Sequence, residues 1–317
     1  MFIRKTFFFC MILSLLFILP LQTFAAKPVP NSAVSYTAPI SLYWLSKAKV
    51  PEAVEYVKYI DAESILKPEN ISQYERVEKV NKIYHEIRYT SLNDFILSEN
   101  YSNVMDLGCG ISPRCLFTAE NKINYVGVEL PDVVEMLNVY APNFLNDDAK
   151  KFVRFVAADV ADRNGMMNAA KNFDGEICIV EEDLLAYLPR EKQKAMLENI
   201  RDILKEHGGC FVTSDFVAGE IFMSSDRIIY GDEDALTIAK ETQKVYENLS
   251  QILFNDTMFK SADEAINFVE SCGLKVELRP VLKNISDIRS VRDLNNRDIS
   301  AINDVTSQKL LWVITAK

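Results

Sequence analysis

The feature that most constrains the fold is a series of short, nearly unbroken apolar runs that alternate with helical patterns after residue 98. These runs span Asn103–Leu107, Tyr125–Leu130, Phe152–Val160, Glu176–Glu181, Cys210–Phe216, Leu274–Val281 and Leu310–Thr315. Apolar strands separated by helices are typical of a mainly parallel sheet that helices cover on both faces. The sequence therefore predicts an α/β core over residues 99–317.

Helix boundaries are marked between the apolar runs. Residues 190–207 carry an apolar stripe between Pro189 and a Gly-Gly pair, which is the usual punctuation of a helix. Ser261 and Glu264 form a capping-box pattern in front of a second helix. Both segments are predicted to be helices that link neighbouring strands.

Two further segments are expected to be helical and to lie near the active site. Residues 26–98 show apolar residues at three- and four-residue spacing from Ser35 onward and predict an N-terminal helical segment. Residues 217–260 are more than a crossover between strands needs, so we expect a helical insertion there that covers the site.

The first 25 residues have the three parts of a secretory signal peptide. Arg4 and Lys5 precede an apolar run over Phe7–Leu19, and small residues surround a cleavage position after Ala25. We expect export to a periplasm or to the medium, with no stable membrane insertion after cleavage. The alternative is an uncleaved signal that anchors the protein in a membrane.

The charge and the cysteines restrict the partners and the covalent framework. The chain has 35 Lys and Arg against 45 Asp and Glu, a net charge of −10, so nucleic acid is not an expected partner. Five cysteines follow the predicted cleavage position, most of them in apolar stretches: Cys109, Cys115, Cys178, Cys210 and Cys272. They are interpreted as buried thiols rather than a disulfide framework.

A glycine-containing turn follows the first apolar run. Asp106, Gly108 and Gly110 stand where this strand gives way to a helix, and glycines there let the backbone come close to a ligand. A nicotinamide dinucleotide fold would have a third glycine at the position of Pro113. The turn is therefore a candidate nucleotide site, and a nicotinamide oxidoreductase is disfavoured.

Acidic residues stand near the ends of the next two runs. Glu129 ends the second run, 21 positions after Gly108, where an acid accepts hydrogen bonds from both ribose hydroxyls of an adenosine. Asp159 is expected to accept from the adenine amino group while Val160 packs beside it. Its alternative role is to cap the turn that follows.

Three consecutive carboxylates, from Glu181 to Asp183, follow the fourth run. Carboxylates are costly to bury together, so one of them is expected to face a cofactor or a substrate. A metal site is the competing interpretation. We reject it because neither a histidine nor a further carboxylate lies nearby at ligand spacing.

From Ser35 to the C-terminus, the chain resembles leucine carboxyl methyltransferases and the related polyketide O-methyltransferases. The motifs concerned are Ser35–Ala38, Lys47-Ala48, Asp61-Ala62, Arg88, Asp106–Gly110 with Arg114, Glu129–Pro131, Ala158–Val160, Glu182–Leu188 and Leu311–Lys317. The resemblance implies a Rossmann-like, seven-stranded methyltransferase sheet with helices on both faces. It also implies S-adenosyl-L-methionine as cofactor.

The resemblance assigns roles to individual residues. Arg88 would contact the cofactor carboxylate, and Glu182 rather than Glu181 would be the site residue. The chain departs from the family at two positions. Lys47 stands where many members have arginine, and it is expected to contact the cofactor because lysine can still meet a carboxylate as a point charge. Asp183 replaces the usual glycine beside Glu182.

The expected reaction is O-methylation of a carboxylate or hydroxyl group on a small molecule or a protein. A carboxylate acceptor is already ionised and needs no general base, whereas an alcohol usually needs one. His85 and His207 are the only histidines. His207 is expected to be an ordinary residue at a helix C-terminus. His85 lies one helical turn before Arg88 and could line the site, but a solvated helix histidine is the expected role, so no catalytic base is assigned. The alternative is an exported, non-catalytic binding module that keeps the methyltransferase fold.

Overall fold

The computed structural model describes residues 35–60, 62, 71–216, 257–281, 285–307 and 309–317, with isolated residues between 227 and 247. The predicted signal peptide, residues 1–25, lies outside the described residues. So does most of the predicted insertion, residues 217–260. Both stay predictions.

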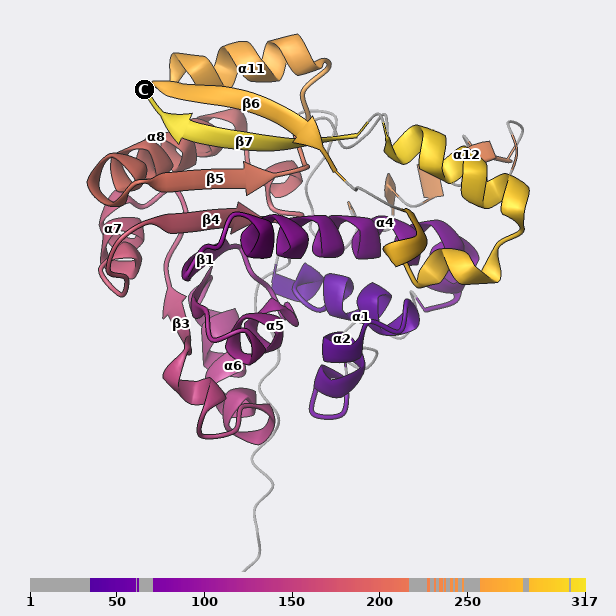
Figure 1. Ribbon diagram of the computed structural model, residues 1–317, viewed down its shortest axis with the longest axis horizontal. Coiled ribbons are helices and arrows are strands. Elements are labelled where there is room, and N and C mark those ends of the chain that lie inside the picture. Colours follow the sequence, from indigo (N-terminus) through magenta and orange to yellow (C-terminus); the bar gives the residue numbers. More distant parts are fainter. Residues whose placement is uncertain are drawn as a thin grey trace, which may run out of the picture.

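The described strands form one sheet (Figure 1). They are β1 (Asn103–Leu107), β2 (Asn124–Glu129), β3 (Val153–Ala157), β4 (Ile177–Glu181), β5 (Gly209–Thr213), β6 (Leu274–Pro280) and β7 (Leu310–Ala316). Their order across the sheet is β3-β2-β1-β4-β5-β7-β6. The pairs among β1 to β5 are parallel, and β7 runs antiparallel to both β5 and β6.

Helices connect these strands and precede them. They are α1 (Ile40–Lys47), α2 (Pro51–Tyr56), α4 (Ile71–Ser98), α5 (Arg114–Glu120), α6 (Pro131–Phe144), α7 (Arg163–Ala170), α8 (Arg190–His207), α11 (Ala262–Ser271) and α12 (Asn296–Thr306). Short 3-10 helices span Ser35–Thr37, Ala149–Lys151, Leu185–Tyr187, Ile285–Asp287 and Ser290–Asp293. In Figure 1, α1 lies between α4 and α2, and α11 lies above β6.

Side chains that alternate along each strand supply two separate cores. In β1, Val104 packs into the core that α1, α2, α4, α5 and α6 share. Met105 and Leu107 pack into the core that α7, α8 and α11 share. Successive residues of a strand point to opposite faces, so both faces of the sheet are covered. The predicted Rossmann-like, seven-stranded methyltransferase sheet with helices on both faces is confirmed.

The helix signals act as the sequence predicts. Helix α8 covers residues 190–207, with Pro189 at its N-cap and Gly208 at its C-cap with φ +78°. At the start of α11, Ser261 Oγ accepts from the N–H of Glu264 at 3.2 Å. The Glu264 carboxylate accepts from the N–H of Lys260 at 2.9 Å, one residue before the donor of a capping box.

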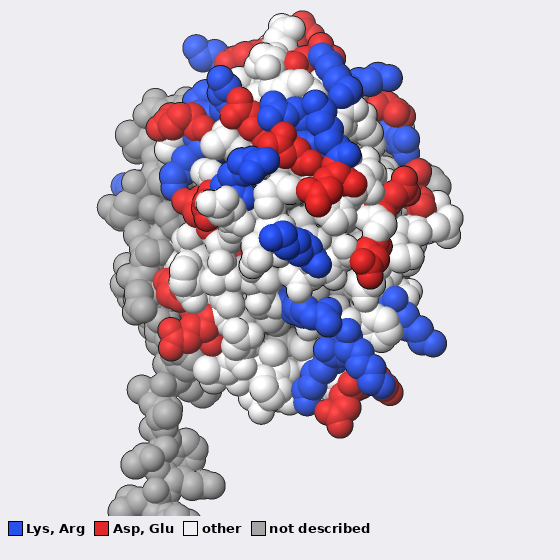
Figure 2. Space-filling view, turned by 90° about the vertical axis from the view of Figure 1, so that its left-hand side faces the viewer, with Lys and Arg blue, Asp and Glu red and all other residues white. Residues whose placement is uncertain are grey.

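All five cysteines named above are buried and free, as predicted for core thiols. One face of the molecule, which includes α7 and α8, carries Lys and Arg among Asp and Glu (Figure 2). Within the described ranges, no helix is both long and apolar enough to cross a membrane.

Candidate functional site

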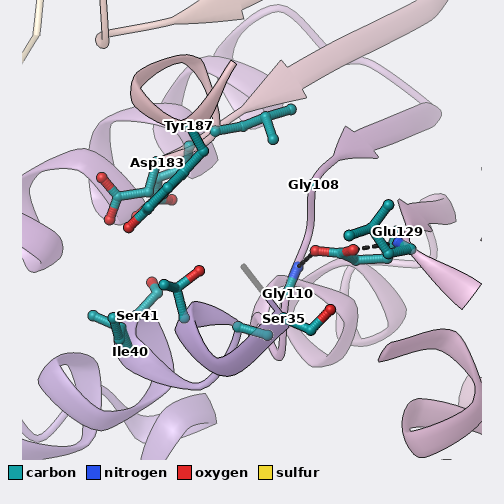
Figure 3. Close-up of a pocket in the computed structure, with 13 residues that line it drawn as sticks. Ser35, Ile40, Ser41, Gly108, Gly110, Glu129, Asp183 and Tyr187 are labelled. Carbon is teal, nitrogen blue, oxygen red and sulfur yellow. Dashed lines mark hydrogen bonds between the residues drawn. The ribbon is translucent and has the colours of Figure 1, made fainter. Parts of the chain in front are cut away.

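A cavity opens where β1, β2 and β4 end (Figure 3). The carboxyl ends of parallel strands are where open α/β sheets bind ligands. The described residues that line it are Ser35, Thr37, Ala38, Ile40, Ser41, Gly108, Gly110, Glu129, Leu130, Glu182, Asp183, Leu184 and Tyr187. Four of the predicted site residues thus meet here, from three strand ends, and the segment around Ser35 closes one side.

The glycine turn is shaped by close neighbours. Gly108 has φ +58° and Gly110 φ +51°, a region that glycine enters without steric cost. A Cβ atom on Gly108 would lie 2.9 Å from Leu184 Cδ1, and one on Gly110 would lie 2.7 Å from the carbonyl oxygen of Ala38. The turn therefore needs glycine for its conformation and for the closeness of its neighbours.

Glu129 lies beside this turn and is held by the backbone. Its carboxylate accepts from the N–H of Gly110 at 3.3 Å and from the N–H of Leu130. Burial raises the pKa of Glu129 to about 7, although the two N–H donors lower it. The carboxyl group is thus fixed at the cavity wall.

Arg114 links the glycine turn to the loop after β4. Its Nη1 donates to Asp106 Oδ2 at 2.9 Å and its Nη2 to Glu182 Oε2 at 2.6 Å, while its Nε donates to Asn93 at 3.0 Å. Arg114 and Asp106 are each 1% exposed. Asp106, predicted to bind cofactor, is therefore a buried partner that positions Arg114 and does not line the cavity.

Arg88 is buried behind Asp183. Its Nη1 donates to Asp183 Oδ1 at 2.8 Å and its Nη2 to Asp215 Oδ2 at 2.6 Å. Its Nε has no hydrogen-bond partner among the described residues. Arg88 is expected from the resemblance to meet a ligand carboxylate, and in this structure it already holds two carboxylates of the protein.

Asp183 is fixed in an unusual backbone conformation. Its φ is +70°, which suits the glycine that the resemblance leads one to expect at this position. Its N–H donates to Asp215 at 2.5 Å. Glu181 accepts from the N–H groups of Leu184 and Leu185 at 2.6 and 3.0 Å, so the loop after β4 is held by its backbone.

The choice of Glu182 over Glu181 agrees with their environments. Glu181 is fully buried and also accepts from Thr213 Oγ1 at 2.5 Å, so it has a structural role. Glu182 lines the cavity, and its Oε1 is buried with no hydrogen-bond partner among the described residues. An unpaired buried carboxylate oxygen is costly unless a ligand supplies a donor.

The expectation that His85 is a solvated helix residue is wrong. His85 is 1% exposed, and its Nδ1 lies 3.7 Å from Asp183 Oδ2. Burial lowers the pKa of His85 to about 4, although Asp183 raises it. The imidazole is therefore neutral beside the cavity.

The remaining predicted residues lie elsewhere. Asp159 accepts from the N–H of Ala161 at 2.9 Å and from Lys192 Nζ at 2.7 Å, which corresponds to its alternative role as a turn cap. Val160 is buried in the core near α7 and α8. Lys47 Nζ lies 5.0 Å from the centre of the Tyr43 ring. None of the three lines the cavity, and their cofactor contacts stay predictions.

Two residues of the site, Asp183 and Asp215, are not predicted as site residues from the sequence. Asp183 appears there as the last of three consecutive carboxylates and as a departure from the family, but Glu182 is the one chosen as the site residue. Asp215 falls within the predicted strand Cys210–Phe216, but β5 ends at Thr213. The polar pair Ser214-Asp215 inside an apolar run was the available signal that the strand ends early.

No protein-family model and no curated protein matches the sequence. Among solved structures, one match is an O-methyltransferase from neocarzinostatin biosynthesis in complex with S-adenosylmethionine and 2-hydroxy-5-methyl naphthoic acid. It has 14% identity and a TM-score of 0.46, and covers 90% of this chain and 71% of that chain. Another is the magnesium protoporphyrin IX methyltransferase of Synechocystis PCC 6803 with bound SAH, with 12% identity, a TM-score of 0.45, and 78% and 94% covered.

A third match is the plantazolicin methyltransferase, in complex with a desmethyl analogue and SAH. It has 12% identity and a TM-score of 0.42, and covers 90% of this chain and 100% of that chain. Similarity of this degree says nothing about chemistry. The function therefore rests on the residues of the site.

Proposed function

We propose that this protein is an S-adenosylmethionine-dependent methyltransferase of the leucine carboxyl methyltransferase and polyketide O-methyltransferase type. The observation that carries the proposal is the contact between Glu129 and the glycine turn. The Glu129 carboxylate accepts a hydrogen bond from the N–H of Gly110, and it lies beside a turn that has no side chains at Gly108 and Gly110. This is the arrangement that an adenosine ribose needs at the end of a parallel strand.

The described residues suit such a cofactor in two respects. Gly108 and Gly110 line the cavity without a side chain, so a ligand in the cavity can approach the backbone of the turn. Glu182 Oε1 lacks a donor, which an amino group of the ligand would supply. Glu129 would hold the ribose, and the glycine turn and Glu182 would hold the amino-acid part.

The residues of this protein would bind the cofactor, orient the acceptor and exclude water. S-adenosylmethionine supplies an electrophilic methyl group when it is bound. Transfer of such a group needs an acceptor in line with the breaking bond, so positioning provides much of the acceleration. A hydroxyl acceptor usually needs a general base, whereas a carboxylate acceptor does not. His85 is neutral and could act as a base, but it is buried beside Asp183. We therefore favour a carboxylate acceptor.

A second candidate, an exported binding module without catalysis, is favoured by one observation. Arg88 is already held by Asp183 and Asp215, so a cofactor carboxylate would have to share this guanidinium with two carboxylates of the protein. We propose export through the predicted signal peptide for either function. Methylation of a small-molecule or protein acceptor distinguishes the enzyme from the binding module, because only the enzyme transfers a methyl group.

Calorimetric titration with S-adenosylmethionine and S-adenosylhomocysteine tests the proposal. Glu129→Ala removes two charge-assisted hydrogen bonds, so affinity is expected to fall at least tenfold, from about 1.5 to 3 kcal/mol per bond. Gly108→Val is expected to abolish binding, because a branched side chain meets Leu184 at this position. Glu135→Ala, at an exposed position on α6, is the matched control and should bind normally.

Binding that is absent at millimolar cofactor, or that is equal in Glu129→Ala and the wild type, would contradict the proposal. Binding without transfer to any carboxylate or hydroxyl acceptor would favour the binding module. Circular dichroism of each variant shows whether it remains folded.

A further inference from the structure

The charged residues among those that line the cavity are all acidic. They are Glu129, Glu182 and Asp183, and the described lining contains neither lysine nor arginine. Figure 3 shows Asp183 on the opposite side of the cavity from Glu129 and Gly110. If Glu129 holds the ribose of a nucleoside, the tail of that nucleoside points toward Asp183 and Glu182.

Two arginines lie behind these carboxylates and not in the cavity. Arg88 is 2% exposed and Arg114 is 1% exposed. The Asp183 side chain covers the first of them at 2.8 Å, and Glu182 covers the second at 2.6 Å. Each cation thus reaches the cavity only through an acidic side chain.

Asp183 presents carboxylate surface to the cavity, and one oxygen of Glu182 is buried without a partner among the described residues. The side chain of Asp183 is 34% exposed. Glu182 is 7% exposed, and its Oε1 has no partner among the described residues. His85 Nδ1 lies 3.7 Å from the second oxygen of Asp183. The tail end of the cavity can therefore accept hydrogen bonds from a cationic group.

From this arrangement we infer that Asp183 determines the specificity of the site. Its ion pair with Arg88 hinders a ligand carboxylate from binding this arginine. The site therefore favours an S-adenosyl cation whose tail carries an amino group without the α-carboxylate. The inference rests on the proposed nucleoside site and concerns only its tail end. S-adenosylmethionine still binds, but its carboxylate has to compete with the carboxylate of Asp183 for Arg88.

The competition is costly because the loop is fixed. The N–H of Asp183 donates to Asp215 at 2.5 Å, and Glu181 binds the next two N–H groups. A ligand carboxylate at Arg88 would therefore face the carboxylate of Asp183 at short range, and like charges repel strongly where water is excluded. An ammonium group meets the opposite situation and gains charge-assisted hydrogen bonds.

Three nucleosides distinguish binding of the tail from binding of the ribose. Calorimetry on the full chain compares S-adenosylmethionine, decarboxylated S-adenosylmethionine and 5′-methylthioadenosine, which has no charged tail. The wild type is expected to bind the decarboxylated cation at least tenfold more tightly than S-adenosylmethionine, because both carry the amino group but only S-adenosylmethionine carries a carboxylate that Asp183 repels. In Asp183→Asn the ratio of the two affinities should fall to about one or reverse, because Arg88 can then bind the carboxylate of S-adenosylmethionine.

Matched variants isolate the charge. Asparagine has the shape of aspartate and tolerates a positive φ, and Asp183→Gly provides a second variant that suits the φ of +70°. Both should leave the affinity for 5′-methylthioadenosine within about twofold, a change of at most about 0.4 kcal/mol. Asp202→Asn removes an aspartate whose ion pairs are with Arg163 and Arg201, outside the cavity, and should leave the ratio unchanged.

The outcomes distinguish this inference from the proposed function. If 5′-methylthioadenosine binds but the wild type prefers S-adenosylmethionine, or if both Asp183 variants keep the wild-type ratio, the inference is wrong and the nucleoside site remains. If none of the three nucleosides binds, both fail.

Discussion

The carbonyl oxygen of Ala38 lies 2.7 Å from the position that a Cβ atom on Gly110 would occupy. The same carbonyl accepts from the N–H of Ile111 at 3.0 Å. The segment in front of α1 is therefore bound directly to the glycine turn and forms part of the cavity wall. The absence of a side chain at Gly110 thus brings together two parts of the chain that are more than 70 residues apart.

Gly110→Ala is expected to displace this segment and destabilise the protein. An alanine at φ +51° costs about 1–2 kcal/mol in backbone strain, and the overlap with Ala38 adds about 1–3 kcal/mol. Gly175→Ala is the matched control, since Gly175 has φ +83° and nothing within 4 Å of its added Cβ. Denaturant unfolding measures both, and equal losses would mean that the contact with Ala38 contributes nothing.

Nucleoside affinity is expected to rise with pH because Glu129 must be ionised to accept two ribose hydroxyls. Since burial raises its pKa to about 7, affinity for S-adenosylhomocysteine should increase up to about tenfold per pH unit below that value and level off above it. Titrations from about pH 5.5 to 8.5 measure this. Glu129→Gln should bind more weakly and show a flatter profile.

The effect on folding has the opposite sign. The pKa of Glu129 is higher in the folded state than in the unfolded chain, so the folded state holds its proton more tightly. The resulting contribution to stability is complete below the unfolded value and is lost as pH rises through about 7. A wild type whose stability relative to Glu129→Gln rises over this range would contradict the assignment.

The sequence predicts the elements well where punctuation is strong. Strand β1 and helix α8 have the predicted bounds, because a glycine turn follows the first and proline and glycine flank the second. The predicted strand Phe152–Val160 is too long, since β3 covers Val153–Ala157. Asp159 binds the N–H of Ala161, and this local turn competes with extension of the strand.

The buried polar residues of α4 are not predictable from the sequence. Glu86 is fully buried, although it is charged, because its carboxylate accepts from the N–H groups of Arg289 and Ser290 at 2.7 Å. His85 and Arg88 likewise have partners in distant loops. A periodicity of apolar residues cannot show such contacts, so the polar half of the site emerges only from the fold.

Export makes a prediction about the N-terminus. If residues 1–25 are a cleaved signal, the mature protein should begin near Ala26, and intact-mass analysis of the exported fraction measures this. Leu16→Arg interrupts the apolar run and should keep the protein unprocessed inside the cell. An exported protein that still begins at Met1 would instead favour the uncleaved anchor.

Removing Arg114 should destabilise the fold far more than removing a surface arginine. Arg114→Met leaves Asp106 and Glu182 buried without their cation, and breaking a buried pair in this way costs about 3–5 kcal/mol. Arg163→Met is the control, because its pair with Asp202 is exposed and is worth at most about 1 kcal/mol. Denaturant midpoints measure the difference.

A second substitution shows whether the loss comes from unpaired charge. Asp106→Asn added to Arg114→Met removes one of the stranded carboxylates and keeps an acceptor for Tyr125, whose hydroxyl donates to Asp106 at 3.0 Å. The double variant is therefore expected to recover part of the lost stability, on the order of 1–2 kcal/mol. If it is no more stable than Arg114→Met, the loss reflects packing of the long side chain and not the ion pairs that join the glycine turn to the loop after β4.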